Sequence, residues 1–349
     1  MVYKPRFTIT PEINNRIARI EKIKQIVESS RILPQQEITL RYRAAVDAVH
    51  SSTTIEGNPL KRQEVVKGLS GRLVNAPERA ITEVVNYKKA LDWLAKRQLR
   101  KTPITGKDIL RLHALTMAGL LAGQKVGRYR PGPVYIVDVK NGRDYLRYTG
   151  PKAANVAKLV NELLNWLEQE SKRLHPVLTA GILHFEFVSI HPFSDGNGRV
   201  TRLLTLLFLR LSGYGFRDTL IPDVYYLRFR QQYYQALSQA RTYPGQRQAD
   251  LTPWIEYFTG GFLTSADELK RNITLVTLAK QSGQTMELTA EEITLLDFGK
   301  TMGRIDLQDA MEILEAPKRT VQRRLNSLVE KGLLVKQGKS KNIYYQISK

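Results

Sequence analysis

The sequence contains no cysteine among its 349 residues. Disulfide bonds, thiolate catalysis and cysteine-based zinc sites are therefore excluded. It also lacks an uninterrupted apolar run of the roughly eighteen residues that a membrane span needs, and its amino terminus has no apolar core of signal-peptide length. We therefore expect a soluble cytoplasmic protein without a membrane partner.

Acidic residues are also few, since 33 Asp and Glu stand against 54 Lys and Arg, which gives a formal net charge of +21. This excess predicts attraction to the phosphates of nucleic acid, of a nucleotide or of a membrane surface. The hydrophobic content of 42% is ordinary for a globular protein that buries a core. The length suits two or three domains.

Hydrophobic periodicity predicts a mainly α-helical chain. Apolar residues recur at three- and four-residue spacing over most of residues 11–99, and Gly57-Asn58-Pro59 interrupts these helices as a stop signal. Residues 134–139 are rich in β-formers and precede Asn141-Gly142, so a β-hairpin is expected there. Helices resume up to residue 278, and the most apolar ones flank a polar segment at residues 191–199.

The carboxy-terminal part has a different pattern. Polar residues 279–287 predict a linker, and three helical segments then precede two short strands around a basic loop, as in a winged helix. From Lys318 onward nine basic residues stand against Glu330 alone, a layout typical of docking on duplex DNA. A basic face used for protein contacts is the alternative. The candidate DNA contacts are Lys318, Arg319, Arg323, Arg324, Lys339 and Lys341.

The polar segment HPFSDGNGR, at His191 to Arg199, has the residue types of a phosphate site. Gly196 and Gly198 stand just before a helix, where backbone N–H groups can converge on an anion beside the positive end of the helix dipole. Arg199 and Arg202 lie three apart in the first turn and project to the same side. Two guanidinium groups beside such glycines suit a polyphosphate.

Two further residues of this segment suggest catalysis. Asp195 fits a Mg²⁺ ligand beside bound phosphates, and His191 can accept a proton from an attacking hydroxyl near neutral pH. No Gly-Lys-Ser/Thr follows, which excludes a Walker A loop, and no His-Glu-x-x-His occurs. The alternative is a helix cap, a turn and surface charges, but two apolar helices have no structural reason to hold the whole set at their junction.

The segment HPFSDGNGRVTR resembles the Fic family motif, His-x-Phe-x-Asp-Gly-Asn-Gly-Arg-x-x-Arg, at every specified position. The resemblance implies transfer of AMP from ATP to a Ser, Thr or Tyr hydroxyl of a protein, with release of pyrophosphate. It also implies the role of each residue: His191 as general base, Phe193 as the anchor of the loop, Asp195 as the Mg²⁺ ligand, Gly196, Asn197, Gly198 and Arg199 as phosphate-binding residues, and Arg202 as the ligand of the γ-phosphate.

The fragment SSTTIEGN resembles the inhibitory motif of the same family, Ser/Thr-x-x-x-Glu-Gly/Asn, with Ser52, Glu56 and Gly57 in register. The resemblance implies that the Glu56 carboxylate pairs with Arg202 in the place of the γ-phosphate. In some members of this class the equivalent Glu also helps to remove AMP from the target. A helix end closed by Glu-Gly-Asn-Pro is the alternative.

Two other segments resemble parts of Fic proteins. The hairpin resembles the family's flap, with Val134, Tyr135, Ile136 and Val137 aligning a target segment by strand addition. The segment QQYYQALSQAR resembles the one that closes over the nucleotide base, with Tyr233 as the stacking residue. Arg241 stands where this segment usually has Asn. A surface hairpin and a core tyrosine are the alternatives.

The resemblance extends from about residue 35 to about residue 265. We expect a mainly α fold with an amino-terminal helical region bearing the inhibitory motif (1–105), a Fic catalytic core with a flap (106–278), a linker (279–287) and a winged helix-turn-helix domain (288–349). The predicted function is a self-inhibited protein adenylyltransferase that uses ATP and Mg²⁺. The alternative is a DNA-binding transcriptional regulator with a nucleotide-sensing core. The expected partners are a target protein with an acceptor hydroxyl, DNA and a second copy of the chain as a homodimer.

Overall fold

The computed structural model describes residues 3–30, 32, 34–98, 102–140, 143–170, 172–281, 288–302, 304–314, 316–338 and 343–348. The chain divides into two compact units, Met1–Thr274 and Leu275–Lys349. Each unit has an apolar core of its own. Within the described residues, no helix is both long enough and apolar enough to cross a membrane.

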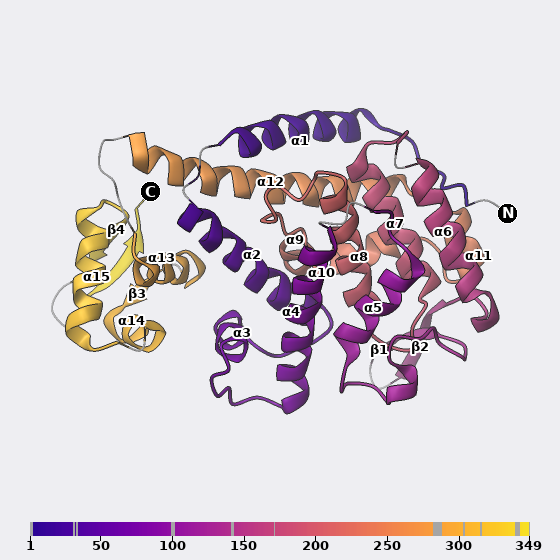
Figure 1. Cartoon of the computed structure of the whole chain (residues 1–349), viewed down its shortest axis with the longest axis horizontal. Helices are drawn as coiled ribbons and strands as arrows, with labels where there is room; N and C mark the ends of the chain where they lie inside the picture. Colours follow the sequence, from indigo (N-terminus) through magenta and orange to yellow (C-terminus); the bar gives the residue numbers. More distant parts are fainter. Residues whose placement is uncertain are drawn as a thin grey trace. The chain divides into compact units, whose positions relative to one another are not determined.

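The first unit is mainly helical, as its hydrophobic periodicity predicts (Figure 1). Its strands β1 (Tyr135–Lys140) and β2 (Arg143–Thr149) pair antiparallel. Two short 3₁₀ helices, η1 (Gly123–Lys125) and η2 (Ala153–Asn155), flank this hairpin in sequence. The α-helices are α1 (Pro11–Ser29), α2 (Pro34–Ile55), α3 (Arg62–Leu69), α4 (Glu78–Gln98), α5 (Gly106–Met117), α6 (Val156–Glu170), α7 (Pro176–Ile190), α8 (Asn197–Leu211), α9 (Asp223–Arg228), α10 (Arg230–Leu237), α11 (Tyr243–Gln248) and α12 (Thr252–Gln281).

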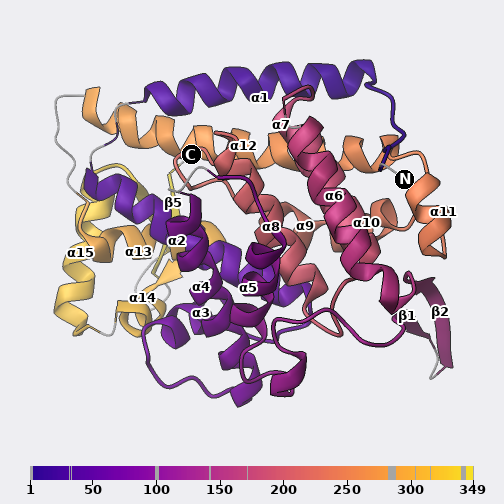
Figure 2. The same ribbon diagram turned by 45° about the vertical axis from the view of Figure 1, so that its right-hand side comes forward.

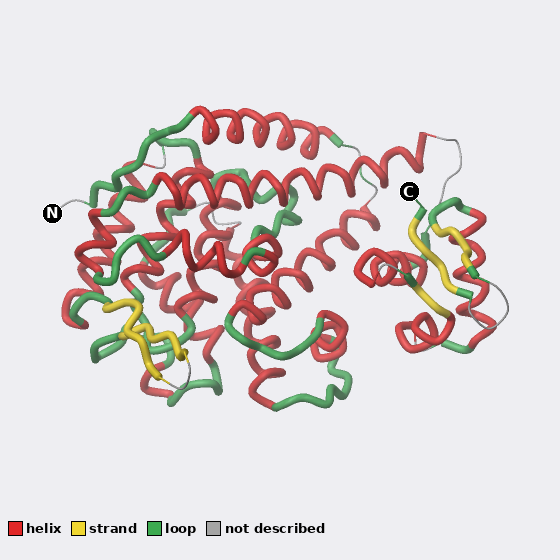
Figure 3. Tube along the Cα trace, turned by 180° about the vertical axis from the view of Figure 1, so that it is seen from behind, coloured by secondary structure: helices red, strands yellow, loops and turns green. Residues whose placement is uncertain are grey.

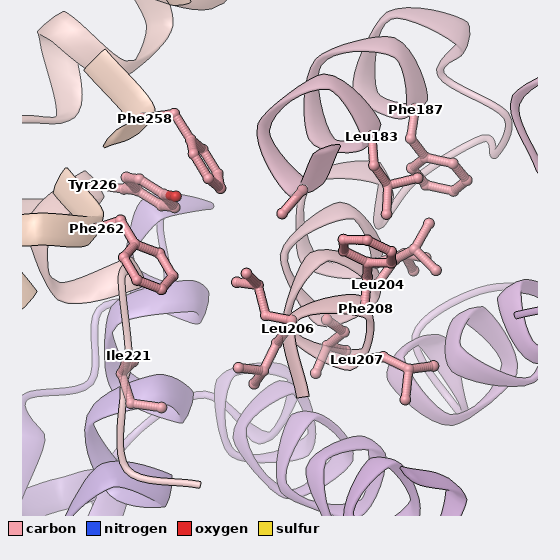
Figure 4. Packing of buried hydrophobic residues seen from close by; sticks show 14 of the residues in the cluster. Leu183, Phe187, Leu204, Leu206, Leu207, Phe208, Ile221, Tyr226, Phe258 and Phe262 are labelled. Carbon is pink, nitrogen blue, oxygen red and sulfur yellow. The ribbon is translucent and has the colours of Figure 1, made fainter. Parts of the chain in front are cut away.

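Helices α7 and α8 form the centre of this unit. Leu183 and Phe187 of α7 lie toward Leu204 and Phe208 of α8, and all four are buried (Figure 4). Gly181 lets α12 approach α7, because a β-carbon there would lie 3.0 Å from Ile255. Burial of both helices fixes the loop that joins them, residues 191–196, relative to the core.

Helix α1 runs alongside α12 in both ribbon views (Figures 1 and 2). Thr10 caps its first turn, and the Arg19 guanidinium pairs with Asp267 of α12 at 2.9 Å. Ile13 and Ile20 of α1 are fully buried. The amino-terminal segment is therefore part of the first unit's packed core.

Helix α2 ends at Ile55, where the sequence predicts a stop. Gly57 has a φ of 96°, and its N–H donates to the Thr54 carbonyl at 2.9 Å, while the Asn58 N–H donates to the Thr53 carbonyl at 3.1 Å. These bonds satisfy carbonyls that a helix end otherwise leaves free. Helix α2 packs against α4 and α9, which directs its carboxyl end toward the start of α8.

The hairpin forms where the β-rich stretch predicts it, one residue later than expected. The Val134 carbonyl accepts a hydrogen bond from the Gly150 N–H at 3.1 Å, and the ladder begins at Tyr135, opposite Thr149. The register shifts between Ile136 and Val137. The predicted turn residues, Asn141 and Gly142, lie outside the described residues.

The second unit contains α13 (Ala290–Met302), α14 (Leu307–Leu314) and α15 (Lys318–Glu330), with strands β3 (Ile305–Asp306), β4 (Leu334–Gln337) and β5 (Tyr344–Ile347). The three strands form an antiparallel sheet in the order β3-β5-β4 (Figure 3). Val321, Leu325 and Leu328 of α15 are buried with Tyr345 of β5 in its core. Because α12 continues to Gln281, the first residues of the predicted linker are helical, and residues 282–287 lie outside the described residues.

Candidate functional site

His191 occupies the junction between α7 and the polar loop. It is the C-cap of α7 and has left-handed backbone angles, φ 50° and ψ 60°, which few residues other than glycine adopt. Its N–H donates to the Phe187 carbonyl at 3.2 Å, and its own carbonyl accepts from Arg130 Nε at 2.8 Å. These bonds hold a backbone geometry that costs about 1–3 kcal/mol, as is common at functional sites.

The imidazole of His191 is prepared to accept a proton. Its Nδ1 lies 3.1 Å from the Val188 carbonyl, and only a protonated Nδ1 can donate to a carbonyl. The Nε2 of the neutral ring therefore carries the lone pair. Burial lowers the pKa of His191 from its ordinary value, while the Val188 bond and the nearby Glu56 and Asp195 charges oppose this. The neutral, basic form is thus favoured.

Arg130 fastens this junction to the base of the hairpin. Its guanidinium donates to the carbonyls of His191 (2.8 Å), Gly132 (2.6 Å) and Pro151 (2.6 Å), and its side chain is buried. Its N–H also donates to the Pro192 carbonyl at 2.9 Å. Arg130 is therefore a positioning residue for the loop.

The loop is held on its core side by three side chains, those of Phe193, Asn197 and His113. Phe193 is fully buried and stacks on the His113 ring, with centroids 3.9 Å apart. The Asn197 side chain makes 2.8 Å hydrogen bonds to both the N–H and the carbonyl of Phe193. The Asn197 amide is thus used within the loop, so any contact with a phosphate would come from its backbone N–H. His113 Nδ1 accepts from the Gly127 N–H at 2.9 Å, so its Nε2–H donates to the Asp195 carbonyl.

The two glycines of the loop need their small size. Gly196 has a φ of 79°, and a β-carbon there would lie 2.6 Å from Met117 Sδ. A β-carbon on Gly198 would overlap the Glu56 carboxylate. The first N–H groups of α8 have no intrahelical partners, so the chain approaches an anion closely at this point.

Asp195 and Arg199 can meet the charges of a nucleotide. The Arg199 side chain is 3% exposed, and within the described residues its Nε and Nη1 have no hydrogen-bond partner, although Glu83 lies 3.6 Å from Nη1. Buried N–H groups of an arginine that lack a hydrogen-bond partner are suited to bind a phosphate. Asp195 is partly exposed and lies between Arg199 (3.3 Å) and Arg79 (3.6 Å).

Asp195 is the sole candidate metal ligand of the loop. The described residues contain no cluster of three or more His, Asp or Glu side chains that could hold a metal ion on their own. A single carboxylate fits Mg²⁺ when substrate phosphates and water complete the coordination. When bound, Mg²⁺ would neutralise charge on those phosphates.

Glu56 lies directly over this cradle. Its Oε1 accepts a hydrogen bond of 2.8 Å from Arg202 Nη2, and the Arg202 side chain is 1% exposed. Ser52 holds the same guanidinium from α2, because its Oγ accepts from Nε at 2.7 Å and its carbonyl accepts from Nη2 at 2.9 Å. The structure therefore brings together Ser52, Glu56, Gly198 and Arg202.

Residues 103–209, which contain the whole loop and the helices that hold it, match the family model described as Fic/DOC family. Residues 103–209 thus resemble a Fic/DOC domain. A solved Fic family protein from Desulfovibrio desulfuricans G20 has a similar structure, with a TM-score of 0.62 and 28% identity, covering 99% of this chain and 98% of that one. The Caenorhabditis elegans Fic-1 structure covers 78% of this chain at 23% identity, with a TM-score of 0.59, and shows a similar fold.

Curated relatives carry the name protein adenylyltransferase Fic. The one from Nematostella vectensis is 27% identical over 246 residues, which are 69% of this chain and 52% of that protein. The one from Drosophila grimshawi is 30% identical over 213 residues, 60% of this chain and 39% of that protein. The chain thus spans about half the length of these relatives or less.

The hairpin of strands β1 and β2 exposes part of the predicted flap segment. Tyr135 and Val137 point outward, with 58% and 47% of their surfaces exposed, and Leu146 lies opposite Val137 and is also exposed. Ile136 packs against the core instead, and Val134 is half-buried. The alternation of a strand explains this division.

The structure corrects the prediction for Tyr233. This residue is 1% exposed, its hydroxyl is hydrogen-bonded to His184 Nε2 at 2.9 Å, and its ring stacks on Tyr226, so it cannot stack on a bound base in this conformation. Its neighbour Tyr234 is only partly buried and donates to the Ile55 carbonyl, one residue before Glu56. Tyr234 is the ring of this pair that reaches the predicted inhibitory segment.

Four of the predicted DNA contacts lie within the described residues, and three of these four are exposed. Lys318, Arg319 and Arg323 lie on the exposed face of α15. Arg324 instead pairs with Glu291 of α13, with its Nε 2.5 Å from the carboxylate. Lys339 and Lys341 lie outside the described residues.

Sequence reasoning missed several residues that support the site, namely Glu83, His113, Arg130 and Tyr234. His113 follows the apolar spacing of α5, and Arg130 stands in the arginine-rich stretch GRYRPG, so neither differs from a core or surface residue by pattern. Glu83 accepts from Asn58 Nδ2 at 2.9 Å and lies near Arg199, which links the predicted inhibitory segment to the loop. Only the tertiary structure reveals these contacts.

Proposed function

We propose that the protein is a self-inhibited protein adenylyltransferase, which moves AMP from ATP to a hydroxyl of a target protein. The observation that supports this most is the position of Glu56 over Gly198 and against Arg202, in the midst of an otherwise complete phosphate cradle. The name of the curated relatives agrees with the activity.

In this proposal the acceptor hydroxyl attacks the α-phosphorus of ATP. A bond forms between the hydroxyl oxygen and the α-phosphorus, the bond from that phosphorus to the bridging oxygen breaks, and pyrophosphate leaves. His191 Nε2 accepts the hydroxyl proton, and the buried Arg199 and the α8 amide groups hold the phosphates. Asp195 would hold Mg²⁺ on the phosphate side of the loop.

Inhibition in this proposal is a competition for one guanidinium. The Glu56 carboxylate occupies Arg202 and the space over Gly198, where the γ-phosphate would lie, so ATP binds unproductively or weakly while Glu56 stays. A charge-assisted hydrogen bond of about 1.5–3 kcal/mol corresponds to about a tenfold to hundredfold shift in the competent population. Removal of AMP from a modified target, with Glu56 assisting, is a second activity to test.

Target binding would use the flap. The exposed Tyr135 and Val137 of β1, with Leu146 of β2, offer apolar positions beside a strand edge, and within the described residues β1 pairs with β2 alone. An extended target segment could add to that edge and present its hydroxyl toward His191. Substitution of both Tyr135 and Val137 by Ser should reduce modification of a target while leaving ATP binding unchanged.

The experiment that tests the proposal compares two labels. The wild type and Glu56→Gly are incubated with Mg²⁺ and a cell lysate, with ATP labelled at either the α- or the γ-phosphate. An adenylyltransferase transfers the α-label and never the γ-label, and mass spectrometry of labelled proteins then identifies the modified hydroxyl. Incorporation of the γ-label alone would identify a kinase and contradict the proposal.

A second candidate function is supported by the basic face of α15. We propose that the second unit is a winged helix in which α15 docks on duplex DNA through Lys318, Arg319 and Arg323, with Lys336 on the exposed face of β4. A gel shift with genomic fragments should show binding that Arg319→Glu with Arg323→Glu abolishes. Retained binding in that double variant would contradict the proposal, and ATP in parallel lanes would show whether the Fic domain controls it.

A further inference from the structure

Arg202 lies beside a second carboxylate that the sequence motifs do not include. Asp223, the first residue of α9, has its Oδ2 3.8 Å from Arg202 Nε, and its side chain is 11% exposed. The Tyr87 hydroxyl donates to the same Oδ2 at 3.3 Å. The buried guanidinium thus has two carboxylates beside it: Glu56 accepts from Nη2, and Asp223 lies near Nε, whose own hydrogen bond goes to Ser52 Oγ.

The buried carboxylate of Asp223 is stabilised by the positive charge of Arg202. Burial raises the pKa of Asp223 to about 6, and the Arg202 charge opposes this rise. Arg202, Asp223, His184 and Tyr226 line a common cavity, and within the described residues the Tyr226 hydroxyl has no hydrogen-bond partner. On this side of Arg202 the Asp223 carboxylate therefore lies among mainly apolar neighbours, including Leu206, Leu209 and Ile221.

We propose that Asp223 is a second counter-ion of Arg202, which competes with Glu56 for the guanidinium and so limits the strength of self-inhibition. This inference rests on the proposed function. A buried cation without a partner is strongly unfavourable, so Glu56 could hardly leave Arg202 if it were the only counter-ion. With Asp223 in place, Arg202 stays paired when Glu56 withdraws and is still available to the γ-phosphate.

The competition makes a specific prediction about a ratio. Asp223 weakens the pairing of Arg202 with Glu56 and with the γ-phosphate alike. The rate of one variant alone therefore does not isolate the effect of Asp223. The activation factor is the ratio of ATP affinity, or of AMP transfer, in the Glu56→Gly variant to that in the same protein with Glu56. This ratio depends only on the pairing of Glu56 with Arg202. This factor should therefore rise by about three- to tenfold when Asp223 is replaced by Asn, as expected for coupled residues.

The test is a double-mutant cycle on the full chain with four proteins: the wild type, Glu56→Gly, Asp223→Asn and the double variant. Binding of ATP with Mg²⁺ is measured by calorimetry with His191→Ala added to each, so that no turnover occurs, and AMP transfer is measured without that change. Asp223→Glu restores the charge and should return the factor toward the wild-type value. Tyr87→Phe keeps the charge and removes only its hydrogen bond, and should leave the factor unchanged.

The outcomes separate this inference from the proposed function. If Glu56→Gly gains neither ATP affinity nor transfer, the proposed function fails. If Glu56→Gly gains both and the factor is the same with and without the Asp223→Asn substitution, only the role of Asp223 is wrong. If Tyr87→Phe raised the activation factor as much as Asp223→Asn does, the role of Asp223 as a counter-ion would also be overturned. A packing or hydrogen-bond role would then explain the result. Asp223→Ser replaces Asp223→Asn if the Asn variant does not fold.

Discussion

Arg202 donates a hydrogen bond of 2.8 Å to Glu56, although the two residues are 146 positions apart in the chain. Glu56 follows the last residue of α2, and Arg202 lies in the second turn of α8, so the contact joins the amino-terminal helices to the region that matches the Fic/DOC family model. The Arg202 side chain is 1% exposed and that of Glu56 is 29% exposed. The carboxylate can thus leave toward solvent, whereas the guanidinium stays in place.

Removal of the Glu56 carboxylate should increase ATP affinity. Glu56→Gly frees Arg202 and the space over Gly198, so we expect the dissociation constant of ATP with Mg²⁺ to fall by about tenfold to hundredfold. Calorimetry measures this directly. Glu64→Gln, which changes a carboxylate that accepts from the Lys61 N–H at the start of α3, serves as the matched control. Equal affinities in the wild type and Glu56→Gly would show that Glu56 does not occupy the phosphate site.

The pH dependence of transfer should reflect a neutral His191. Burial lowers its pKa, and the Glu56 charge partly opposes this. The base is active when unprotonated, so activity of Glu56→Gly should persist at pH 6.5 and be lost only as the pH falls through a value below the ordinary pKa of about 6.5. A profile of kcat/KM against pH measures the inflection. Loss of activity centred above pH 6.5 would be incompatible with His191 as the base.

Gly196→Ala should destabilise the loop. The new methyl group would require a positive φ of 79° from alanine and would lie 2.6 Å from Met117 Sδ. We expect the free energy of unfolding to fall by about 1–3 kcal/mol, with loss of transfer. Gly123→Ala is the control, since a β-carbon there meets nothing within 4 Å. Thermal unfolding compares the two, and an equal Tm for both variants would show that the loop tolerates the change.

Arg130→Met should affect both stability and activity. The substitution leaves the carbonyls of His191, Gly132 and Pro151 without the donor that each now has. We expect a loss of about 2–4 kcal/mol of stability and a lower kcat with little change in ATP affinity, because the cradle is intact while His191 is not held. Arg128→Met, at an exposed arginine of the same stretch, is the control. A normal kcat in a folded Arg130→Met protein would refute the positioning role.

The sequence allows the helices and the site loop to be predicted, because hydrophobic spacing and the HPFSDGNGR residues are local features. The contact of Glu56 with Arg202 follows only from the family resemblance, since no local pattern joins positions so far apart. The choice between Tyr233 and Tyr234 could not be made, because adjacent tyrosines on a short helix can each face the core. Packing with Tyr226 and His184 buries Tyr233 and leaves Tyr234 near the site.

The same limit applies to Asp223 and Glu83. Both are carboxylates at helix positions where a surface charge is the usual interpretation, and the structure shows that each meets an arginine of α8. Their importance depends on which helices pack together, which periodicity does not specify. Tertiary structure was therefore needed to find the residues that surround the motif, while the motif itself was evident from the sequence.

The most direct test of the account is the rate of AMP incorporation from α-labelled ATP, with Mg²⁺, by three purified proteins. These are the wild type, Glu56→Gly and the Glu56→Gly, His191→Ala double variant. We predict incorporation into the protein itself or an added target that rises by about tenfold or more in Glu56→Gly and returns to background in the double variant. An unchanged rate on loss of Glu56, or a rate that survives loss of His191, would contradict the account.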